Sequence, residues 1–372
     1  MTAAGLVLLA AALAASQGWL DRHFLPSFLM PRAWYVRIET GVRLAVAVFG
    51  VVLIVRGRAI AASFTRRRLG RVVPVVLAVV IALAAAGLVL GRSGAGSGAW
   101  LDTAEEPLRQ ADARLGWTFV PARTGAETVG GRRIEYALDE AGCRVARAGQ
   151  KVDPEDTTVL FTGESIVFGD GLTYEESVPA QVEAMLGIQS ANLGVYGFST
   201  SQMYIKLQTS LPRFRRPAAV VALFMTALLG RNLDDDRPHM GPGLVWEPAR
   251  PRAKLVSLAT LLVPFRRSVT VERGIAVTRE VLTAVVNLAR SHGAVPLIAV
   301  PQIGPEAEPE RVLRRRILDE PGLPYVLISL DPAWHRPWNR HPDARAAHEM
   351  AVAIAARLRE NGLSFKQGVA KR

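Results

Sequence analysis

Five short apolar runs, each followed by a helical pattern, constrain the fold of this chain more than any other feature. The runs fall at residues 159–161, 190–193, 219–224, 295–300 and 325–330, and the helical patterns at 175–186, 201–211, 271–292, 310–318 and 343–361. Strands that alternate with helices in this way form a mostly parallel sheet. We therefore predict one α/β domain over residues 101–372, with a partly β lead-in at 101–155.

Two segments of the chain depart from the alternation of strands and helices. Residues 92–100 read Arg-Ser-Gly-Ala-Gly-Ser-Gly-Ala-Trp and predict a flexible linker. Residues 233–268 are long for a connection and rich in Pro and Arg, as in lids and binding loops. The apolar patch within this insertion, at 255–265, either packs on the domain or contacts a membrane.

Residues 1–91 predict a membrane anchor with three apolar segments, at about 3–20, 40–56 and 72–91. The last holds 20 uncharged, mostly apolar residues, enough at about 1.5 Å per residue to cross a hydrocarbon core of about 30 Å. The middle segment has only 12 uninterrupted apolar residues, so a re-entrant or interfacial segment is the alternative. A signal peptide is the alternative for the first, but that segment lacks a basic start.

Charge is distributed unevenly along the chain. Of the formal net charge of +12, residues 1–100 carry +9, from 11 Arg, no Lys and two acids. Six arginines lie between residues 56 and 71, and positive loops stay cytoplasmic. The last span then leads outward, so we expect a protein of a bacterial-type inner or plasma membrane with an extracytoplasmic domain. The excess charge is therefore a topology signal, and nucleic-acid binding is not expected.

The chain offers no sign of a disulfide or a metal site. A single cysteine, Cys143, rules out an internal disulfide and reads as a buried thiol. Acids and histidines gather between residues 331 and 348, but their spacing fits no tight metal motif. We expect neither a metal nor another cofactor.

Four polar features follow the predicted strands, where ligands bind in open α/β sheets. They are Ser165 in Gly-Glu-Ser, Gly197 after an Asn-Leu-Gly run, Asn232 in Gly-Arg-Asn, and His341 in His-Pro-Asp. Each alone is typical of an ordinary turn. Their joint order predicts a nucleophilic serine early in the domain and its base late in it.

This set resembles the SGNH, or GDSL, family of hydrolases over roughly residues 113–360. The resemblance implies a flavodoxin-like three-layer α/β/α domain with a mostly parallel sheet. It also implies that Ser165 attacks an acyl carbonyl while His341 takes its proton. The oxyanion would be stabilised by the Ser165 and Gly197 N–H groups and the Asn232 amide, donors worth about 2.7–4 kcal/mol each where measured.

The chain departs from the family pattern at three places. Glu164 replaces the Asp beside the nucleophile, and Leu233 replaces the Asp after the third motif. Where the family has an Asp two or three residues before the His, this chain has Trp338 and Asn339. Asn339 could orient the imidazole by a hydrogen bond, and alternatives are a backbone carbonyl, such as that of Trp338, or Asp331 folding back. We also place Glu164, Trp334 and Trp338 as candidate pocket residues.

These observations predict a membrane-anchored extracytoplasmic serine esterase. Its substrates would be O-acyl, for example acetyl, groups on envelope or surface glycans or related esters. One alternative is an acyltransferase for exopolysaccharide O-acetylation that uses the same residues beside a membrane acyl-transfer partner. Another is a binding or scaffold module on a hydrolase fold that has lost its activity.

Overall fold

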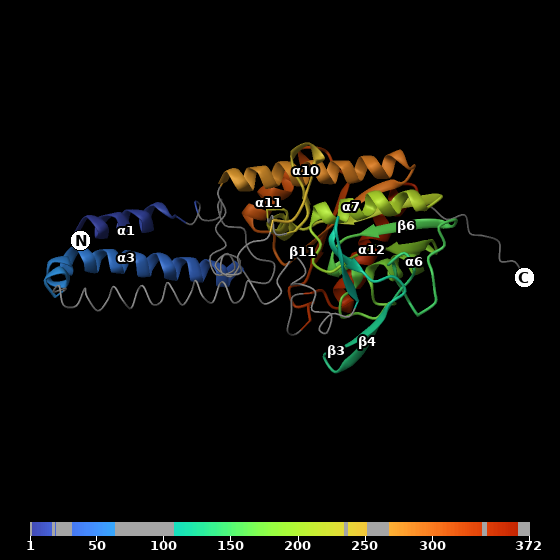
Figure 1. Ribbon diagram of the computed structural model, residues 1–372, viewed down its shortest axis with the longest axis horizontal. Coiled ribbons are helices and arrows are strands. Elements are labelled where there is room, and N and C mark those ends of the chain that lie inside the picture. Colours follow the sequence, from blue (N-terminus) through green and yellow to red (C-terminus); the bar gives the residue numbers. More distant parts are fainter. Residues whose placement is uncertain are drawn as a thin grey trace, which may run out of the picture. The chain divides into compact units, whose positions relative to one another are not determined.

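The computed structural model describes residues 2–16, 19, 32–63, 108–233, 237–250, 268–336 and 341–363. The chain divides into two compact units, one formed by the N-terminal helices and the other by the α/β domain. Each unit is described below by itself (Figure 1). The predicted span at 72–91 and the linker at 92–100 lie outside the described residues.

The N-terminal unit contains two apolar helices that pack against each other, α1 (Thr2–Ala14) and α3 (Arg32–Ser63). Glycines let the two backbones approach closely, since a Cβ on Gly50 would lie 2.9 Å from the Gly5 carbonyl oxygen. The stretch Val36–Arg56 is long and apolar enough to cross a membrane by length and composition. Helix α3 thus includes Arg37, Glu39 and Arg43, so it is longer than the 12-residue apolar run of the middle predicted segment. Within the first predicted segment α1 ends at Ala14 and Trp19 is again helical, while residues 17, 18 and 20 lie outside the described residues.

The α/β domain is built on an eight-stranded sheet with the order β12-β11-β8-β6-β7-β5-β4-β3. Five of these strands are mutually parallel: β6 (Thr157–Thr162), β7 (Gln189–Asn192), β8 (Arg216–Leu223), β11 (Val295–Ile303) and β12 (Tyr325–Leu330). Numbered along the chain, their spatial order is 2-1-3-4-5, the flavodoxin-like order. The predicted mostly parallel sheet is confirmed, and all five predicted apolar runs are strands.

Three antiparallel strands from the lead-in extend the sheet beyond β7: β3 (Thr124–Val129), β4 (Arg132–Leu138) and β5 (Arg144–Val145). Two small hairpins complete the β structure: β1 (Arg109–Asp112) with β2 (Gly116–Phe119), and β9 (His239–Met240) with β10 (Trp246–Glu247). The second hairpin belongs to the predicted insertion. Its Met240 is buried and the Trp246 indole donates to the Arg114 carbonyl, so this part of the insertion packs on the domain. The patch at 255–265 lies outside the described residues.

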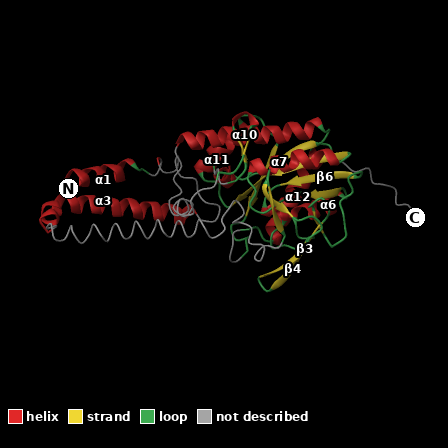
Figure 2. Ribbon diagram, viewed as in Figure 1, coloured by secondary structure: helices red, strands yellow, loops and turns green. Residues whose placement is uncertain are grey.

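Helices flank the sheet (Figure 2). The long ones are α6 (Val178–Leu186), α7 (Thr200–Ser210), α10 (Ser268–Ser291) and α12 (Ala344–Glu360). The shorter ones are α5 (Ser165–Phe168), α8 (Leu229–Asn232), α11 (Glu308–Arg314), the π-helical turn η4 (Arg315–Asp319), and the 3₁₀ turns η1 (Leu211–Arg213), η2 (Thr226–Leu228) and η3 (Pro242–Leu244). α6 packs against α12, which also contacts β11 and β12.

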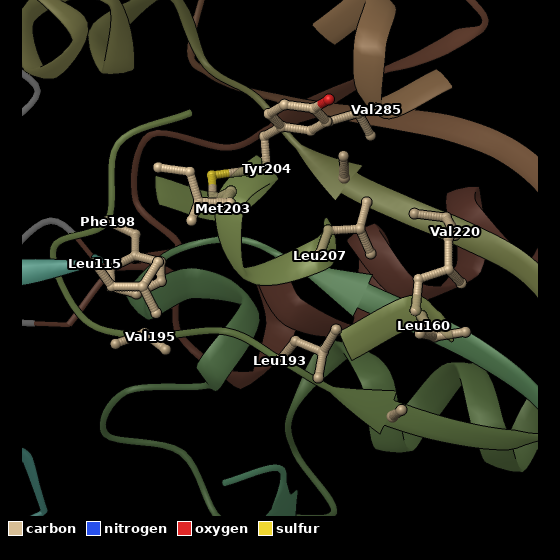
Figure 3. Close-up of a cluster of buried hydrophobic side chains, with 14 of the residues drawn as sticks. Leu115, Leu160, Leu193, Val195, Phe198, Met203, Tyr204, Leu207, Val220 and Val285 are labelled. Atoms are coloured by element: carbon tan, nitrogen blue, oxygen red, sulfur yellow. The ribbon is translucent and has the colours of Figure 1, made fainter. Parts of the chain in front are cut away.

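The core forms because alternate strand residues face the helices. Leu160 of β6 and Val220 of β8 join Leu207 of α7 and Val285 of α10 in one buried cluster (Figure 3). These residues are at most 3% exposed. Burying a side chain of this size contributes about 1.5–3 kcal/mol. The packed strands hold their carboxyl ends in fixed positions, where the functional residues emerge.

Candidate active site at the carboxyl edge of the sheet

Ser165 begins a one-turn helix directly after strand β6. The strand ends at Thr162, and Glu164 caps α5 by accepting the Ile166 N–H at 3.1 Å. Gly163 makes this tight turn possible, because a Cβ there would lie 2.2 Å from a methyl carbon of Val167. The geometry places the Ser165 hydroxyl at the edge of the sheet, and the residue is only 5% exposed.

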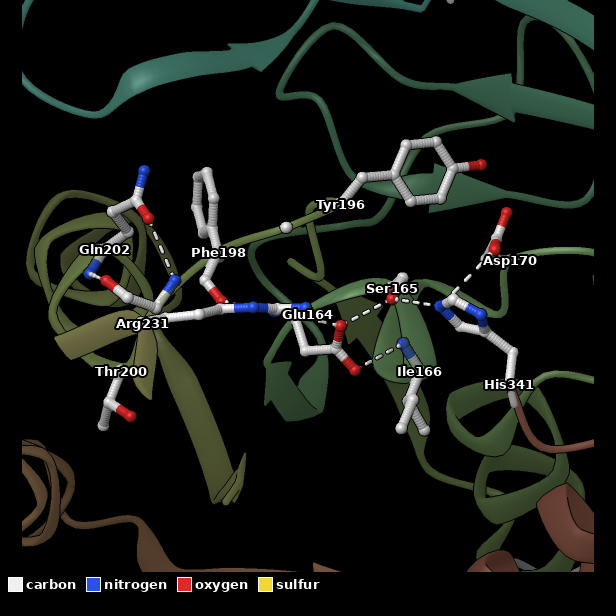
Figure 4. A network of polar contacts seen from close by, with 12 residues as sticks. Glu164, Ser165, Ile166, Asp170, Tyr196, Phe198, Thr200, Gln202, Arg231 and His341 are labelled. Atoms are coloured by element: carbon white, nitrogen blue, oxygen red, sulfur yellow. Dashed lines mark hydrogen bonds and ion pairs between the residues drawn. The ribbon is translucent and has the colours of Figure 1, made fainter. Parts of the chain in front are cut away.

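His341 reaches the same point from the loop before α12. Its Nε2 atom lies 2.8 Å from the Ser165 Oγ atom (Figure 4). The loop is fixed on both sides of the histidine: Arg336 N–H donates to the His341 carbonyl, and the Asp343 side chain caps α12. The structure therefore brings together the serine and histidine that the sequence pairs, although 176 positions separate them.

Glu164 lies beside the serine as a fully buried carboxylate. Its Oε2 atom accepts the Ser165 hydroxyl at 2.5 Å and an Arg231 Nη1–H at 3.3 Å. Burial alone would raise the pKa of this carboxyl, but the Arg231 charge and the Ser165 hydrogen bond outweigh it and hold the pKa below 4.5. Glu164 is therefore an anion at neutral pH. Its contacts with other side chains are with Ser165 and Arg231.

The single proton of the Ser165 hydroxyl has two neighbouring acceptors, the Glu164 carboxylate and the His341 imidazole. The shorter distance is to the carboxylate, and two oxygens at 2.5 Å need a proton between them. The resting arrangement that satisfies both contacts has the hydroxyl donating to Glu164 and the imidazole Nε2–H donating to the serine oxygen. Ring tautomers are assigned from such networks.

Asp170 supplies a second carboxylate to the site. Its Oδ2 atom lies 3.6 Å from the His341 Nε2 atom and accepts a hydrogen bond from Arg336 at 2.5 Å. Burial lowers the pKa of His341, and the opposing attraction of Asp170 and Glu164 does not restore it. The imidazole is thus neutral at neutral pH, as a general base must be.

The loop that carries Asp170 is held from inside the protein by Arg144. This side chain is 1% exposed and donates to the carbonyl oxygens of Phe168, Gly169 and Leu172 at 2.6–2.8 Å. Burial lowers the pKa of Arg144, and its guanidinium also lies over the Phe168 ring, 5.0 Å from the centroid. Next to it, the Gly171 N–H donates to the Tyr136 hydroxyl. The two contacts fix the turn that follows the nucleophile.

Other predicted site residues have different surroundings. Gly197 has a positive φ of 71° and its carbonyl accepts from Arg237. Asn232 accepts from the Thr200 N–H at 3.1 Å and donates to the Thr278 hydroxyl at 2.8 Å. Among the described residues, no hydrogen bond joins Asn232 to Ser165 or Glu164.

The residues proposed to orient or surround the histidine are only partly described. Trp334 is half-buried, with the Arg345 guanidinium 6.0 Å from its ring centroid. Asp331 accepts from the Ala333 N–H within its own turn. Asn339 and Trp338 lie outside the described residues, and their roles stay predictions.

The sequence interpretation missed three charged residues of this site, namely Asp170, Arg231 and Arg336. A signal existed for two of them. Asp170 follows the nucleophile by five positions in Ser-Ile-Val-Phe-Gly-Asp, so one helical turn and a glycine bring it back to the site. Arg231 stands next to the predicted Asn232. Arg336 gave no signal.

A small hollow adjoins the histidine. Asp170 and His341 line one part of it, and the remainder is mostly apolar, with Ile166, Leu172, Val178, Pro342 and Met350 among its residues. No group of three or more His, Cys, Asp or Glu in the described parts of the chain could hold a metal ion. The chemistry available here is that of a hydroxyl, an imidazole, two carboxylates and two guanidinium groups.

Fold and site together define an α/β protein of flavodoxin-like strand order. The serine follows β6 and Arg231 follows β8, the two strands that flank the switch point where such sheets bind ligands. No protein-family model matches the chain, and no curated protein matches it.

Several solved structures resemble the chain. A carbohydrate acetylesterase family member from Sinorhizobium meliloti is 16% identical over 55% of this chain and 98% of that one, with a TM-score of 0.34. A member of the lipolytic G-D-S-L family from Veillonella parvula is 13% identical over 54% and 97%, with a TM-score of 0.33. A family two carbohydrate esterase from Clostridium thermocellum is 11% identical over 58% and 67%, with a TM-score of 0.36. At these scores the similarities assign no function.

Proposed function

We propose that the protein is a membrane-anchored serine esterase. The observation that carries the proposal is the hydrogen bond between the Ser165 Oγ and His341 Nε2 atoms, at 2.8 Å and at the ligand-binding edge of the sheet. The substrates proposed are O-acyl, in particular acetyl, esters of envelope or surface glycans. The domain is proposed to act outside the membrane that holds the N-terminal helices.

The reaction begins when the imidazole proton moves from Nε2 to Nδ1, which makes Nε2 an acceptor, and the Ser165 hydroxyl turns from Glu164 to His341. The serine oxygen attacks the ester carbonyl carbon, its proton passes to His341, and the carbonyl electron pair moves to oxygen. Collapse of this intermediate breaks the bond to the alcohol, which leaves with the proton from His341. The Asp170 carboxylate, 3.6 Å from Nε2, stabilises the transient imidazolium.

Water completes the cycle. It gives one proton to His341 as its oxygen attacks the acyl-serine carbonyl carbon. The second intermediate then collapses, the Ser165 oxygen takes the proton from His341, and the carboxylic acid leaves. Every proton that is taken up is returned, so the reaction needs no cofactor.

The test uses the full chain in detergent micelles. Wild type, Ser165→Ala and His341→Ala are treated with a fluorophosphonate probe and with 4-nitrophenyl acetate. Ser291→Ala is the matched control, because this exposed hydroxyl lies at the end of α10 and contacts only the Leu288 carbonyl and the His292 imidazole among the described residues. We expect labelling and turnover in wild type and the control and their loss in the two site variants.

Full activity in a folded Ser165→Ala variant would contradict the proposal. Adding a glycan acceptor separates the hydrolase from the transferase alternative. Acetate release to water supports an esterase, whereas Ser165-dependent appearance of acetyl groups on the glycan identifies acyl transfer.

A further inference from the structure

The amide of Asn232 makes two structural hydrogen bonds. Its oxygen accepts from the first turn of α7 through Thr200, and its nitrogen donates to Thr278 of α10. Asn232 and Thr278 are both buried, at 8% and 0% exposure. These bonds tie α8 to α7 and α10. The carbonyl oxygen and one of the two Nδ2–H groups are thereby held in place, and among the described residues no hydrogen bond joins this amide to Ser165.

The side chain of Arg231, the preceding residue, points instead toward Glu164. Its Nη1 atom donates to the Glu164 Oε2 atom at 3.3 Å and to the Phe198 carbonyl at 2.9 Å. That Glu164 oxygen is the one that accepts the Ser165 hydroxyl, so only the carboxylate separates the guanidinium from the nucleophile (Figure 4). Among the described residues, the hydrogen bonds of Arg231 use Nη1, while the side chain keeps 29% of its surface exposed.

We propose that the Arg231 guanidinium binds the carbonyl oxygen of the ester and stabilises the oxyanion, in place of an uncharged amide from Asn232. The proposal rests on the proposed esterase function. Arginine presents five N–H donors in a planar fork, so Nη1 can stay on Glu164 while another N–H meets the substrate. A preorganised cation near developing negative charge is stabilising, most of all where water is excluded.

Glu164 makes this arrangement stable in the free protein. A partly buried guanidinium without a partner carries a desolvation cost, and the carboxylate offsets it. In the reaction the hydroxyl proton leaves for His341 and the carbonyl oxygen becomes negative. Arg231 then shares its charge between Glu164 and the new oxyanion. Glu164 is a positioning residue for Arg231, and Arg231 is the catalytic residue.

The experiment compares Arg231→Ala, Arg231→Lys and Asn232→Ala in the full chain. Arg316→Gln is the matched control, since Arg316 is 33% exposed and paired with Glu272 of α10 outside the site. kcat and KM are measured for a neutral ester, 4-nitrophenyl acetate, and for an anionic one, the 4-nitrophenyl hemisuccinate. Guanidinium chloride at millimolar concentration is added to each variant.

We expect Arg231→Ala to lower kcat for both esters by about 10²–10³-fold with little change in KM, the loss typical of one oxyanion donor. Added guanidinium restores part of kcat in this variant alone, which a merely structural role would not allow. Arg231→Lys keeps the charge and retains more activity. Asn232→Ala lowers the unfolding temperature and lowers kcat less than Arg231→Ala does.

Three results would overturn the proposal while wild type shows Ser165-dependent turnover. The first is an unchanged kcat in a folded Arg231→Ala variant. The second is a rise in KM confined to the anionic ester, which makes Arg231 a substrate-anion site. The third is a larger kcat loss in Asn232→Ala without loss of stability. If wild type itself shows no Ser165-dependent turnover, the proposed esterase function fails, and this inference falls with it.

Discussion

The Oδ2 atom of Asp170 lies 3.6 Å from the Nε2 atom of His341, the ring nitrogen that also faces Ser165. In a serine–histidine–aspartate triad the acid bonds the other ring nitrogen. Here the carboxylate instead lies near Nε2, the nitrogen that takes up the Ser165 proton in the proposed reaction. Arg336 holds Asp170 at 2.5 Å, so its position is set by an ion pair.

Replacing Asp170 with Asn tests this role. Asp170 raises the pKa of His341, so its removal lowers that pKa, and the acid limb of the kcat/KM profile moves to lower pH. We expect kcat to fall at the same time, by about 10- to 10⁴-fold, the upper value being that of a triad Asp changed to Asn. Asp156→Asn, a surface acid paired with Arg216, is the control. An acid limb that stays in place or moves upward would contradict the assignment.

The Glu164 carboxyl predicts how stability depends on pH. Its pKa is lower in the folded protein than its ordinary value of 4.5, so its ionised form stabilises the fold above that value. This contribution is lost as the pH falls through the folded-state pKa. Glu164→Gln has no carboxyl to titrate at this position. Its unfolding temperature should therefore be lower than that of wild type at pH 7 and should fall less steeply as the pH is lowered. Melting curves from pH 3 to 8 measure this dependence, with Glu135→Gln at an exposed position as the control. Equal slopes of unfolding temperature against pH in wild type and Glu164→Gln would contradict the prediction.

Arg144 predicts a coupling between stability and activity. Arg144→Met leaves three buried carbonyls without their donor, at a cost of about 3 kcal/mol or more in unfolding free energy. The Asp170 turn loosens with it, so kcat should fall as well. Arg359→Met removes one bond, to the exposed Met185 carbonyl, and serves as the control. Denaturant unfolding and ester turnover in the same samples decide the matter, and an unchanged midpoint would refute the prediction.

The membrane topology can be tested with the protein's own cysteine as background. Cys143 is 1% exposed, and burial raises the pKa of its thiol to about 12, so it reacts poorly with maleimides. We expect Glu135→Cys, at an exposed position of β4, to be labelled in intact cells by a membrane-impermeant maleimide. Wild type is the unlabelled control. Labelling that appears only after the cells are opened would place the domain in the cytoplasm.

The sheet and the serine–histidine pair could be predicted because each depends on local patterns. The apolar run at 159–161 lies in β6, which ends just before Gly-Glu-Ser, and Tyr325–Leu330 is a strand over the residues expected. Ser165 and His341 could be expected to meet, since parallel strands bring their carboxyl ends to one edge of the sheet.

The residues around Ser165 and His341 were harder to predict, because their contacts depend on the direction in which each side chain points. Residues 231 and 232 share one turn of α8, and neighbours on a helix point about 100° apart. One amide therefore faces Thr278 and one guanidinium faces Glu164. Because the sequence gives no side-chain direction, it could not show that Arg231, and not Asn232, contacts Glu164. Asp170 was missed because its approach depends on a left-handed glycine at 169.

The distance along the chain between Ser165 and His341 has a consequence for biosynthesis. Strand β6 leaves the ribosome long before α12, so the growing chain carries a serine with no base beside it. In the proposed reaction the hydroxyl gains its base only when α12 docks against α6 and the loop before it brings His341 to Ser165. In the proposed esterase, a protein cut short before residue 341 would hold its nucleophile without its base, so an unfinished product would not attack esters in the compartment where it is made.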